Sequence, residues 1–361
     1  MKIVIDRNIP YIQGLLEPYA DVVYLPDDEI CNASLIDVDA LLVRTRTRCN
    51  ETLLNGTSVR FIGTATIGTD HIDLDYCKQH NIVVANAAGC NAGAVMQYVV
   101  SSLLLLSQRN KKPLEEMILG VVGVGNVGSL IVKAAGALGM KTLLNDPPRA
   151  AREGNSNFVT LNEVLEKADV VSLHVPLTVD TRDMANDAFF QKIKTGSWFI
   201  NTSRGEVINE NSLIKYRKKL GSVVLDVWSH EPEINEQLLS IADIATPHIA
   251  GYSRQGKTNA TKMVTSALVH FMGYPQLLNL ELNKAFTPKT LTLHEEDSLL
   301  SVIHNIYNIM DDDARLRKNV AAFEKVRNEY VLRDEFNNYR IEGKANKSLS
   351  SKLQVLGFSD A

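Results

Sequence analysis

Apolar and polar residues alternate between two patterns from the N-terminus to about residue 250. Short runs of β-branched residues are separated by stretches with helical spacing, which is typical of parallel strands joined by helical crossovers. In the first part of the chain we predict strands at residues 2–6, 40–44, 60–65 and 82–86. A second series of strands is predicted at residues 118–124, 141–146, 169–175, 197–202, 222–227 and 243–247. The pattern therefore predicts two α/β units.

Two other stretches depart from this alternation. The longest apolar run lies within residues 94–110, where Gln97 and two serines interrupt it. It is shorter than the roughly 20 apolar residues that a membrane-spanning helix needs, so we predict a buried helix. From about residue 280 the chain becomes highly charged, and a third, smaller module is expected there. Apolar residues recur in that module near the spacing of an amphipathic helix, at Leu299, Val302, Ile303, Ile306 and Ile309.

Composition narrows the class of protein. A chain of 361 residues exceeds one ordinary core, and two or three domains are expected. The net charge is −4, with 42 acidic and 38 basic residues, which disfavours nucleic-acid and membrane partners. The four cysteines form no C-x-x-C pair, which argues against a zinc cluster and a disulfide framework, so no metal is expected. With no secretory signal pattern at the N-terminus, a cytoplasmic location is expected.

A glycine-rich loop is the strongest local motif. Gly123, Gly125 and Gly128 form G-x-G-x-x-G directly after an apolar strand, and Asn126 and Val127 lie inside it where a helical stretch begins. Glycine is needed for a tight turn, for close approach of backbone N–H groups to a pyrophosphate, and for close packing of helix on strand. The helix N-terminus then faces the anion. These five residues therefore predict a Rossmann dinucleotide site.

Asp146 ends the next predicted strand, 18 residues beyond Gly128. A carboxylate there accepts hydrogen bonds from both ribose hydroxyls, and its charge repels a 2′-phosphate. We therefore expect NAD in preference to NADP. Arg149 lies close enough in sequence to leave NADP open at this point.

Polar residues that suit hydride transfer follow three later strands. Oxidation of a hydroxyl carbon needs a base and a cation for a substrate carboxylate, in addition to the nicotinamide. Arg204 follows one predicted strand, Asp226 and Glu231 lie at and after the next, and His248 follows the last. Each has an ordinary structural explanation when taken alone. Together they lie where ligands bind in open α/β sheets, because the carboxyl ends of parallel strands share one edge.

These motifs, in this order, resemble the D-isomer-specific 2-hydroxyacid dehydrogenases. The segments that give the resemblance are GVGNVG at 123–128, NTSRG at 201–205, HEP at 230–232 and PHIAG at 247–251. The resemblance implies that His248 is the acid/base, that Glu231 is its partner, and that Arg204 binds the substrate carboxylate. It also implies NAD contacts at Asp146, Val175, Asp226 and Gly251.

Shorter segments resemble one branch of that family, whose substrate is a phosphorylated 2-hydroxy acid. They are GCN at 89–91, NDPP at 145–148 and AGYS at 250–253. The resemblance implies substrate contacts at Thr45, Thr66 and Tyr252. Thr45 lies in VRTRTR, where an extended backbone would place the arginines on one face and the threonines on the other. A phosphate on one face and a solvated strand end are equally compatible with that pattern.

The expected architecture is α/β, with two doubly wound parallel-sheet domains and a small C-terminal α+β dimerisation domain. Residues 1–93 and 254–280 are assigned to a flavodoxin-like substrate domain, 94–253 to the NAD-binding Rossmann domain, and 281–361 to the dimerisation domain. A homodimer is expected. Two alternatives stay open: a dehydrogenase for another D-2-hydroxy acid such as 3-phosphoglycerate or D-glycerate, and a catalytically silent NAD(H)-sensing corepressor on the same scaffold.

Overall fold

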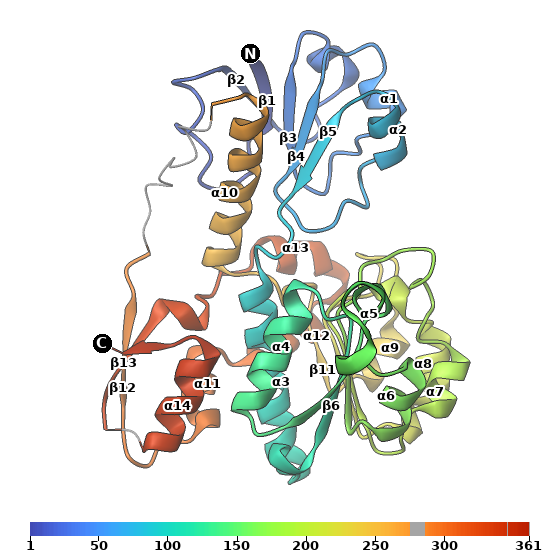
Figure 1. The fold of residues 1–361 in the computed structure, drawn as a ribbon, viewed down its shortest axis with the longest axis vertical. Coiled ribbons are helices and arrows are strands. Elements are labelled where there is room, and N and C mark those ends of the chain that lie inside the picture. Colours follow the sequence, from blue (N-terminus) through green and yellow to red (C-terminus); the bar gives the residue numbers. More distant parts are fainter. Residues whose placement is uncertain (275–285, 345, 361) are drawn as a thin grey trace. The chain divides into compact units, whose positions relative to one another are not determined.

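The computed structural model describes residues 1–274, 286–344 and 346–360 (Figure 1). The chain forms two compact units. The first consists of Met1–Asn91 and Ser253–Thr287, and the second consists of Ala92–Tyr252 and Pro288–Ala361. The predicted boundary between residues 280 and 281 lies outside the described residues.

The first unit contains a five-stranded parallel sheet in the order β2-β1-β3-β4-β5. Its strands are β1 (Lys2–Asp6), β2 (Asp21–Leu25), β3 (Ala40–Val43), β4 (Phe61–Thr64) and β5 (Val83–Asn86). Its helices are α1 (Glu51–Leu54), α2 (Leu74–Gln79), α10 (Arg254–Phe271) and the 3-10 turn η1 (Asn32–Leu35). The four predicted strands are confirmed, whereas β2 is an additional, partly exposed edge strand.

Alternate strand residues of this sheet enter different cores, as the two-residue period of a strand requires. Ile3 and Ile5 pack in a cluster with Leu268 and Val269 of α10. Val4, between them, belongs to a separate cluster on the other face. Because both faces are buried at β1, β3 and β4, these inner strands are predominantly apolar. The chain returns to this unit through α10, which begins at Arg254.

The second unit contains a six-stranded parallel sheet in the order β11-β10-β9-β8-β6-β7. Its strands are β6 (Ile118–Val122), β7 (Lys141–Asn145), β8 (Val170–Leu173), β9 (Trp198–Asn201), β10 (Ser222–Leu225) and β11 (Ile244–Ala245). The helices up to Tyr252 are α3 (Ala92–Asn110), α4 (Asn126–Ala137), α5 (Pro147–Glu153), α6 (Leu161–Lys167), α7 (Asp187–Lys192), α8 (Glu210–Tyr216) and α9 (Glu236–Ile241). Short 3-10 turns are η2 (Leu114–Glu116), η3 (Asn155–Asn157), η4 (Gly205–Val207) and η5 (Arg217–Lys219).

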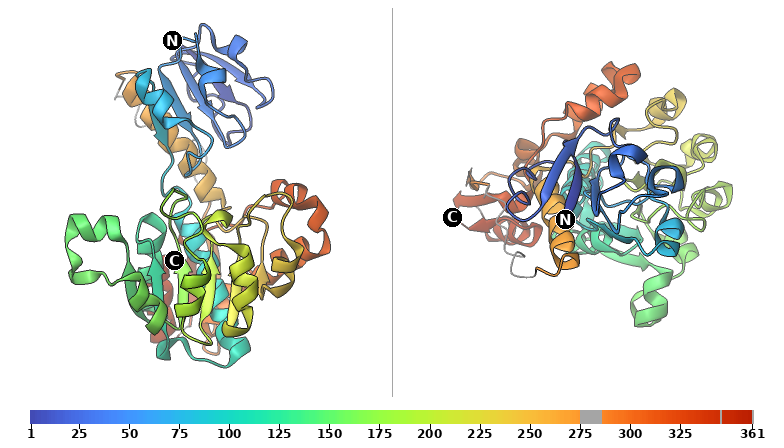
Figure 2. Two further views of the ribbon diagram at one scale, coloured as in Figure 1. Left: turned by 90° about the vertical axis from the view of Figure 1, so that its right-hand side faces the viewer. Right: turned by 90° about the horizontal axis from the view of Figure 1, so that it is seen from above.

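Helices cover both faces of this sheet (Figure 2). Trp198 and Ile200 of β9 pack in the cluster that contains α3 and α4, whereas Phe199 packs in the cluster that contains α6 to α9. The order of the strands across the sheet reverses between β6 and β8. β7 lies on one side of β6, and all later strands of this sheet lie on the other side. Ligands bind beyond the carboxyl ends of strands at such a switch point.

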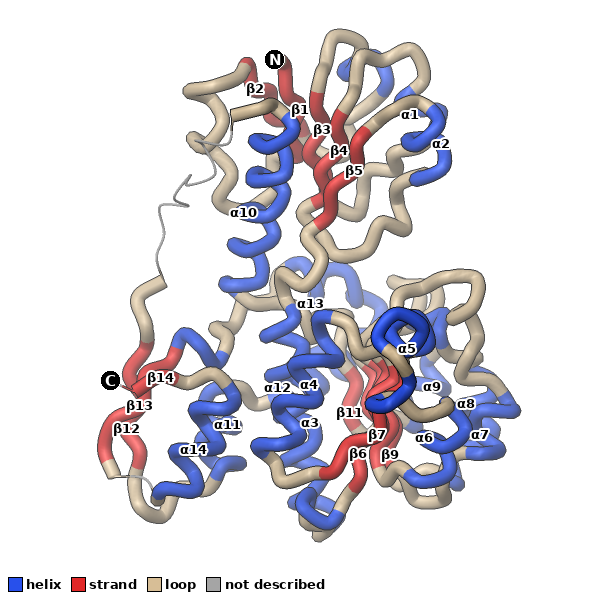
Figure 3. Tube along the Cα trace, viewed as in Figure 1, coloured by secondary structure: helices blue, strands red, loops and turns tan. Residues whose placement is uncertain are grey.

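The C-terminal part of the second unit consists of helices and a small parallel sheet in the order β12-β13-β14 (Figure 3). Its elements are β12 (Lys289–Leu293), α11 (Leu299–Ile306), α12 (Ile309–Lys318), η7 (Val320–Ala322), α13 (Phe323–Asn328), η8 (Phe336–Asn338), β13 (Tyr339–Gly343), α14 (Lys347–Leu356) and β14 (Ser359–Asp360). The predicted amphipathic helix is interrupted after Ile306. Asn308 caps a new helix there by accepting a hydrogen bond from the Met310 N–H.

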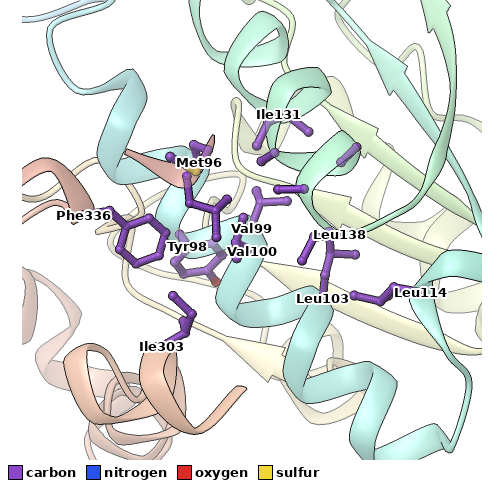
Figure 4. Close-up of a cluster of buried hydrophobic side chains, with 14 of the residues drawn as sticks. Met96, Tyr98, Val99, Val100, Leu103, Leu114, Ile131, Leu138, Ile303 and Phe336 are labelled. Carbon is purple, nitrogen blue, oxygen red and sulfur yellow. The ribbon is translucent and has the colours of Figure 1, made fainter. Parts of the chain in front are cut away.

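This C-terminal part shares a core with α3 and α4. Ile303 of α11 and Phe336 lie against the same cluster as Tyr98 and Val99 of α3 (Figure 4). The long apolar run is therefore a buried helix, as predicted. In the described parts of the chain, no helix has the length and apolarity needed to cross a bilayer.

Candidate active site

The glycine loop follows β6 and opens α4, at the switch point of the six-stranded sheet. Gly123 has φ +88°, and a Cβ there would lie 2.5 Å from the carbonyl oxygen of His174. A Cβ on Gly128 would lie 2.1 Å from the carbonyl oxygen of Gly123. Neither position accommodates a side chain, because backbone lies where the Cβ would be.

Gly125 is different, since a Cβ there would meet nothing within 4 Å. Gly125 and Asn126 are exposed at the first turn of α4, and Val127 is partly buried beside them. The loop is thus tightly packed on the protein side and open on the other, at a helix N-terminus that favours an anion. This arrangement fits the pyrophosphate of a dinucleotide.

Asp146 follows β7 and caps α5. One carboxylate oxygen accepts a 2.8 Å hydrogen bond from the Val124 N–H, and the other accepts from the Arg149 N–H. The Arg149 side chain pairs with Glu153 through contacts of 2.9 and 2.7 Å and donates to the Val124 carbonyl at 2.6 Å. Asp146 is therefore tied to the glycine loop, and the arginine that left NADP open is engaged by another carboxylate.

The other residues expected to contact NAD lie at neighbouring strand ends. Val175 follows β8, and its side chain would meet a Cβ placed on Gly123 at 2.9 Å. Gly251 follows the histidine loop and is partly buried. His174, next to Val175, is neutral, because burial lowers its pKa to about 3. It is therefore not a second charged group at this edge.

Asp226 lies at the end of β10 and is fully buried. Its carboxylate accepts from the Thr246 hydroxyl at 2.6 Å and from the Ile249 and Ala250 N–H groups at 2.8 and 2.9 Å. Burial raises the pKa of Asp226, although His248, Thr246 and these two N–H groups oppose that shift. The described contacts of Asp226 therefore hold the loop around His248.

His248 has φ +57°, a conformation that residues with side chains adopt infrequently. The Asp226 carbonyl accepts a 2.7 Å hydrogen bond from the His248 N–H, and the Asp226 carboxylate binds the next two N–H groups. Strained backbone of this kind persists only where surrounding contacts enforce it, and it is concentrated at functional sites. Asp226 thus holds the histidine loop in place through both its backbone carbonyl and its buried carboxylate.

Glu231 and His248 form a direct pair. Oε2 of Glu231 lies 2.8 Å from Nδ1 of His248, and Oε1 lies 3.1 Å from it. The Trp228 N–H also donates to Oε1 at 3.1 Å, and the Trp228 indole donates to the Thr246 carbonyl. These bonds join the loops after β10 and β11.

The negative charge of the Glu231 carboxylate is stabilised by the groups around it. Burial by itself raises the pKa of Glu231, but His248, Arg327 and the Trp228 N–H outweigh it and lower the net pKa. Glu231 is therefore an ionised acceptor at neutral pH. Since a carboxylate only accepts hydrogen bonds, Nδ1 of His248 is the donor and Nε2 has the lone pair in the neutral ring.

Arg204 follows β9 and starts the short turn η4. Its side chain is partly exposed, and one Nη donates to the Ser203 carbonyl at 2.8 Å. The next residue must be glycine, because a Cβ on Gly205 would lie 1.9 Å from the carbonyl carbon of Trp228. That close approach packs the Arg204 loop directly against the loop that leads to Glu231. Arg204, Glu231 and His248 thus lie on linked loops of one unit.

The residues expected to contact substrate are divided between the units. Thr45 and Thr66 belong to the first unit, and Tyr252 belongs to the second. The Thr66 hydroxyl lies 2.7 Å from that of Thr64, which is 3.1 Å from Nε2 of His71. The Thr66 hydroxyl also donates to the Gly68 carbonyl.

The facial pattern predicted for VRTRTR is wrong. Residues 44–48 form a turn rather than an extended strand, so alternate residues do not share a face. Thr45 is exposed whereas Thr47 is buried. Arg44 forms an ion pair with the buried Asp6 at 2.9 Å.

The C-terminal part adds two arginines that sequence reasoning missed. Nε of Arg327 donates to the Tyr252 hydroxyl at 3.1 Å, and its Nη1 lies 3.5 Å from Oε2 of Glu231. Arg333 is buried and donates to the carbonyl of Ile249, directly after His248, at 3.0 Å. Each arginine is more than 75 residues from its acidic or carbonyl partner in sequence, so no local pattern pointed to them.

Among residues 1–274, 286–344 and 346–360, no group of three or more His, Cys, Asp or Glu side chains could hold a metal ion. The described site contains a histidine–carboxylate pair and a glycine-rich loop, both at strand ends of the six-stranded sheet.

Two segments of the chain match known domain families. Residues 98–250 match the family described as "D-isomer specific 2-hydroxyacid dehydrogenase, NAD binding domain". Residues 281–357 match a domain family of unknown function. The first match contains the glycine loop, Arg204, Glu231 and His248.

Curated relatives match nearly the whole chain. Erythronate-4-phosphate dehydrogenase of Bacteroides thetaiotaomicron is 44% identical over 351 residues, covering 95% of this chain and 99% of that protein. The enzyme of the same name from Klebsiella pneumoniae is 41% identical over 373 residues, covering 99% of this chain and 98% of that protein.

Solved structures share the fold. NAD⁺-bound 3-phosphoglycerate dehydrogenase of Entamoeba histolytica is 27% identical with a TM-score of 0.66, covering 79% of this chain and 99% of that one. D-lactate dehydrogenase of Aquifex aeolicus, complexed with NAD and lactic acid, is 26% identical with a TM-score of 0.63, covering 79% of this chain and all of that one. Both structures leave part of this chain without a counterpart.

The architecture is therefore α/β with parallel sheets, the second unit has a Rossmann NAD-binding fold, and NAD is the cofactor. The chain belongs to the erythronate-4-phosphate dehydrogenase family of NAD-dependent D-2-hydroxyacid dehydrogenases.

Proposed function

We propose that this protein oxidises 4-phospho-D-erythronate at C2 to 2-oxo-3-hydroxy-4-phosphobutanoate, with NAD as acceptor, in the synthesis of pyridoxal 5′-phosphate (vitamin B6). The observation that supports this proposal most strongly is the His248–Glu231 pair, at 2.8 Å, on the strand-end edge that also presents the dinucleotide loop. The substrate assignment rests on relatives of that name that are more than 40% identical along nearly the whole chain.

The cofactor would be held by residues of the second unit. Gly123, Gly125, Asn126, Val127 and Gly128 would contact the pyrophosphate. The ribose hydroxyls would be bound by Asp146, and further contacts would come from Val175, Asp226 and Gly251. When bound, NAD supplies the acceptor for the hydride that leaves C2.

The side chains of the histidine loop would move the proton. Nε2 of His248 takes the proton of the C2 hydroxyl, because Nδ1 already donates to Glu231. The carboxylate of Glu231 stabilises the imidazolium that results. Arg204 binds the substrate carboxylate, for which the planar guanidinium is well suited.

Thr45, Thr66 and Tyr252 contact the substrate. Residues 1–93 and 254–280 act as the substrate domain, 94–253 as the NAD domain, and 281–361 as a homodimerisation domain. The protein works in the cytoplasm on a small-molecule substrate, without nucleic acid or membrane partners. A monomeric mass in multi-angle light scattering would contradict the dimer.

The decisive assay is NADH formation with 4-phospho-D-erythronate, compared with 3-phospho-D-glycerate and D-glycerate, with a trap for the oxo product. The trap prevents the reaction from stalling near equilibrium. We expect phosphoerythronate to give the highest kcat/KM. Preference for another acid would overturn the substrate assignment, and absence of turnover with NAD still bound would favour the silent sensor.

A matched pair of variants tests the threonine contacts. Thr66→Ala should raise the KM for substrate about tenfold through loss of a hydroxyl hydrogen bond, with NAD affinity unchanged. Thr45→Ser retains a hydroxyl and should differ little from the native enzyme. Equal effects of the two variants on KM would contradict the proposed contacts.

A further inference from the structure

The acid–base pair has a third charged partner that comes from the C-terminal part of the chain. Arg327 lies on α13, and its side chain is only 24% exposed. Its Nη1 lies 3.5 Å from the same Glu231 oxygen that contacts His248 at 2.8 Å. Glu231 is therefore shared between a permanent cation and the titratable imidazole.

α13 packs against the core of the second unit, and this packing fixes the position of the contact between Arg327 and Glu231. Phe323, at the start of α13, is buried in the cluster that fills one face of the six-stranded sheet, together with Leu316 of α12. Asp313 of α12 accepts a 2.7 Å hydrogen bond from the Ala245 N–H of β11, the strand before the histidine loop. Arg317 donates to the carbonyls of Leu239 and Ala242.

Arg327 also orders the residue after the histidine loop. Its Nε donates to the Tyr252 hydroxyl at 3.1 Å, and the guanidinium lies 5.9 Å from the Tyr252 ring centroid. The Tyr252 ring in turn makes an edge contact with Tyr330, at 6.0 Å between centroids. One side chain thus links Glu231 to Tyr252, which are 21 residues apart in sequence.

We propose that Arg327 is a positioning residue for the acid–base step: it holds Glu231 and Tyr252 in place, and its positive charge opposes protonation of His248. This inference rests on the proposed roles of Glu231 and His248. It assigns to the C-terminal part a task in the reaction that is separate from dimerisation.

The direction of the charge effect follows from the groups that face the imidazole. Glu231 contacts the imidazole directly and Asp226 is a second carboxyl group near it, whereas Arg327 places a positive charge on the same Glu231 oxygen. Negative charges favour an imidazolium, and a positive charge disfavours it. Burial tends to lower the pKa of Arg327, but Tyr252 and Glu231 outweigh it and raise the net pKa, so Arg327 stays charged throughout the working range. Oxidation needs neutral His248 as the base. Arg327 therefore extends oxidation toward lower pH.

The test is the pH profile of kcat/KM for NAD-dependent oxidation, with the 2-hydroxy acid that the native enzyme uses best. Arg327→Gln retains hydrogen-bonding groups and removes the charge. We expect its acidic limb to move up by about 0.5 to 1 pH unit, from Coulomb interaction at an intermediate dielectric. At neutral pH its kcat/KM should fall about tenfold, because the pair is also misplaced.

Two further variants separate charge from structure. Arg327→Lys retains the charge, so its acidic limb should stay at the native pH while kcat falls several-fold. Arg340→Gln makes the same change at an exposed position of β13 and should match the native enzyme. If Arg327→Gln does not fold, a shifted limb in Arg327→Lys would contradict the proposal, and a native limb with reduced kcat would support it.

Activity measurements on His248→Ala, Glu231→Gln and Arg327→Gln distinguish a wrong role for Arg327 from a wrong proposed function. If His248→Ala and Glu231→Gln lower kcat 100-fold or more while Arg327→Gln keeps the native profile, only the role of Arg327 is overturned. If His248→Ala is fully active, the proposed mechanism itself fails. An equal fractional decrease of kcat/KM in Arg327→Gln at every pH, which leaves the acidic limb at its native position, would assign Arg327 a purely structural role.

Discussion

In both parallel sheets the first strand lies between the second and third strands of that sheet, but different kinds of residue follow the first strand in the two units. The order in which strands are added to the sheet reverses at this first strand, between β1 and β3 in the first unit and between β6 and β8 in the second. In the first unit, Asp6 ends β1 and Arg44 follows β3, and their 2.9 Å ion pair occupies the carboxyl edge. Asp6 is fully buried, and its other oxygen binds the Asn8 N–H.

In the second unit the loop that follows the first strand, β6, is rich in glycine. A Cβ on Gly123 would lie 2.5 Å from the His174 carbonyl oxygen, and Gly125 has open space above it. An ion pair between two side chains lies at one switch point, whereas a glycine loop with open space beside Gly125 lies at the other. The same winding therefore does not by itself make a nucleotide site, because the residues directly after the first strand decide whether an anion-binding glycine loop is present.

The largest expected effect is on the chemical step in the second unit. His248→Ala removes the proposed base, and kcat should fall by about 10²–10⁴-fold, the usual contribution of general base catalysis. NAD binding, followed by quenching of intrinsic fluorescence, should stay close to native, because the glycine loop is intact. A variant that retained native kcat would place the base elsewhere.

Glu231→Gln should be the next most damaging change. Without the carboxylate the imidazolium is less stable, so kcat falls about 100-fold and the acidic limb of the pH profile moves to lower pH. This shift is opposite in sign to that of Arg327→Gln. Stopped-flow or steady-state oxidation rates across pH 5 to 9 would measure it, and shifts of the same sign in the two variants would contradict the shared-acceptor arrangement.

The same variant predicts an effect on stability. The folded-state pKa of Glu231 is below its ordinary value of 4.5, so its ion pair stabilises the fold above that value. This contribution is lost as the pH falls through the lowered pKa. Thermal unfolding of Glu231→Gln should therefore depend less on pH than that of the native protein below about pH 5.

Gly128→Ala should impair the nucleotide site. Its Cβ would lie 2.1 Å from the Gly123 carbonyl oxygen, so the loop must shift at a cost of about 1–3 kcal/mol. NAD affinity should fall about 10- to 100-fold in calorimetric titration. Gly136→Ala is the matched control on the same helix, because its Cβ meets nothing within 4 Å and alanine is the better helix former. Similar losses in both variants would show that helix α4, rather than the loop, was disturbed.

Asp6→Ala tests the first switch point and should have the smallest effect on catalysis. Loss of the buried carboxylate leaves Arg44 and the Asn8 N–H without this acceptor, and the free energy of unfolding should fall by about 1–3 kcal/mol. NAD affinity should not change, because the pair belongs to the other sheet. Chemical denaturation and NAD titration on one preparation would separate the two effects, and reduced NAD affinity in the folded variant would weaken the comparison.

Most strands could be predicted because their signal is local. Both sheets are buried on two faces, so β1, β6 and β10 are continuous apolar runs with clear ends. β2 was missed since it is a partly exposed edge strand. The break after Ile306 was missed because apolar spacing continues across it while the Asn308 cap starts a new helix. The pattern in VRTRTR failed because alternation has meaning only in an extended backbone, and residues 44–48 turn.

Local patterns in the chain were sufficient to predict the α/β class, the glycine loop and Asp146. They also predicted the order of Arg204, Glu231 and His248 after successive strands. These features depend on residues that are neighbours in the chain or on a strand pattern that repeats. Only the tertiary structure showed that Asp226 fixes the strained His248 loop, that Gly205 packs the Arg204 loop on Trp228, and that Arg327 reaches Glu231. Those contacts join residues far apart in sequence, and a charged side chain in a helical pattern has the same local signal whether it meets solvent or a buried carboxylate.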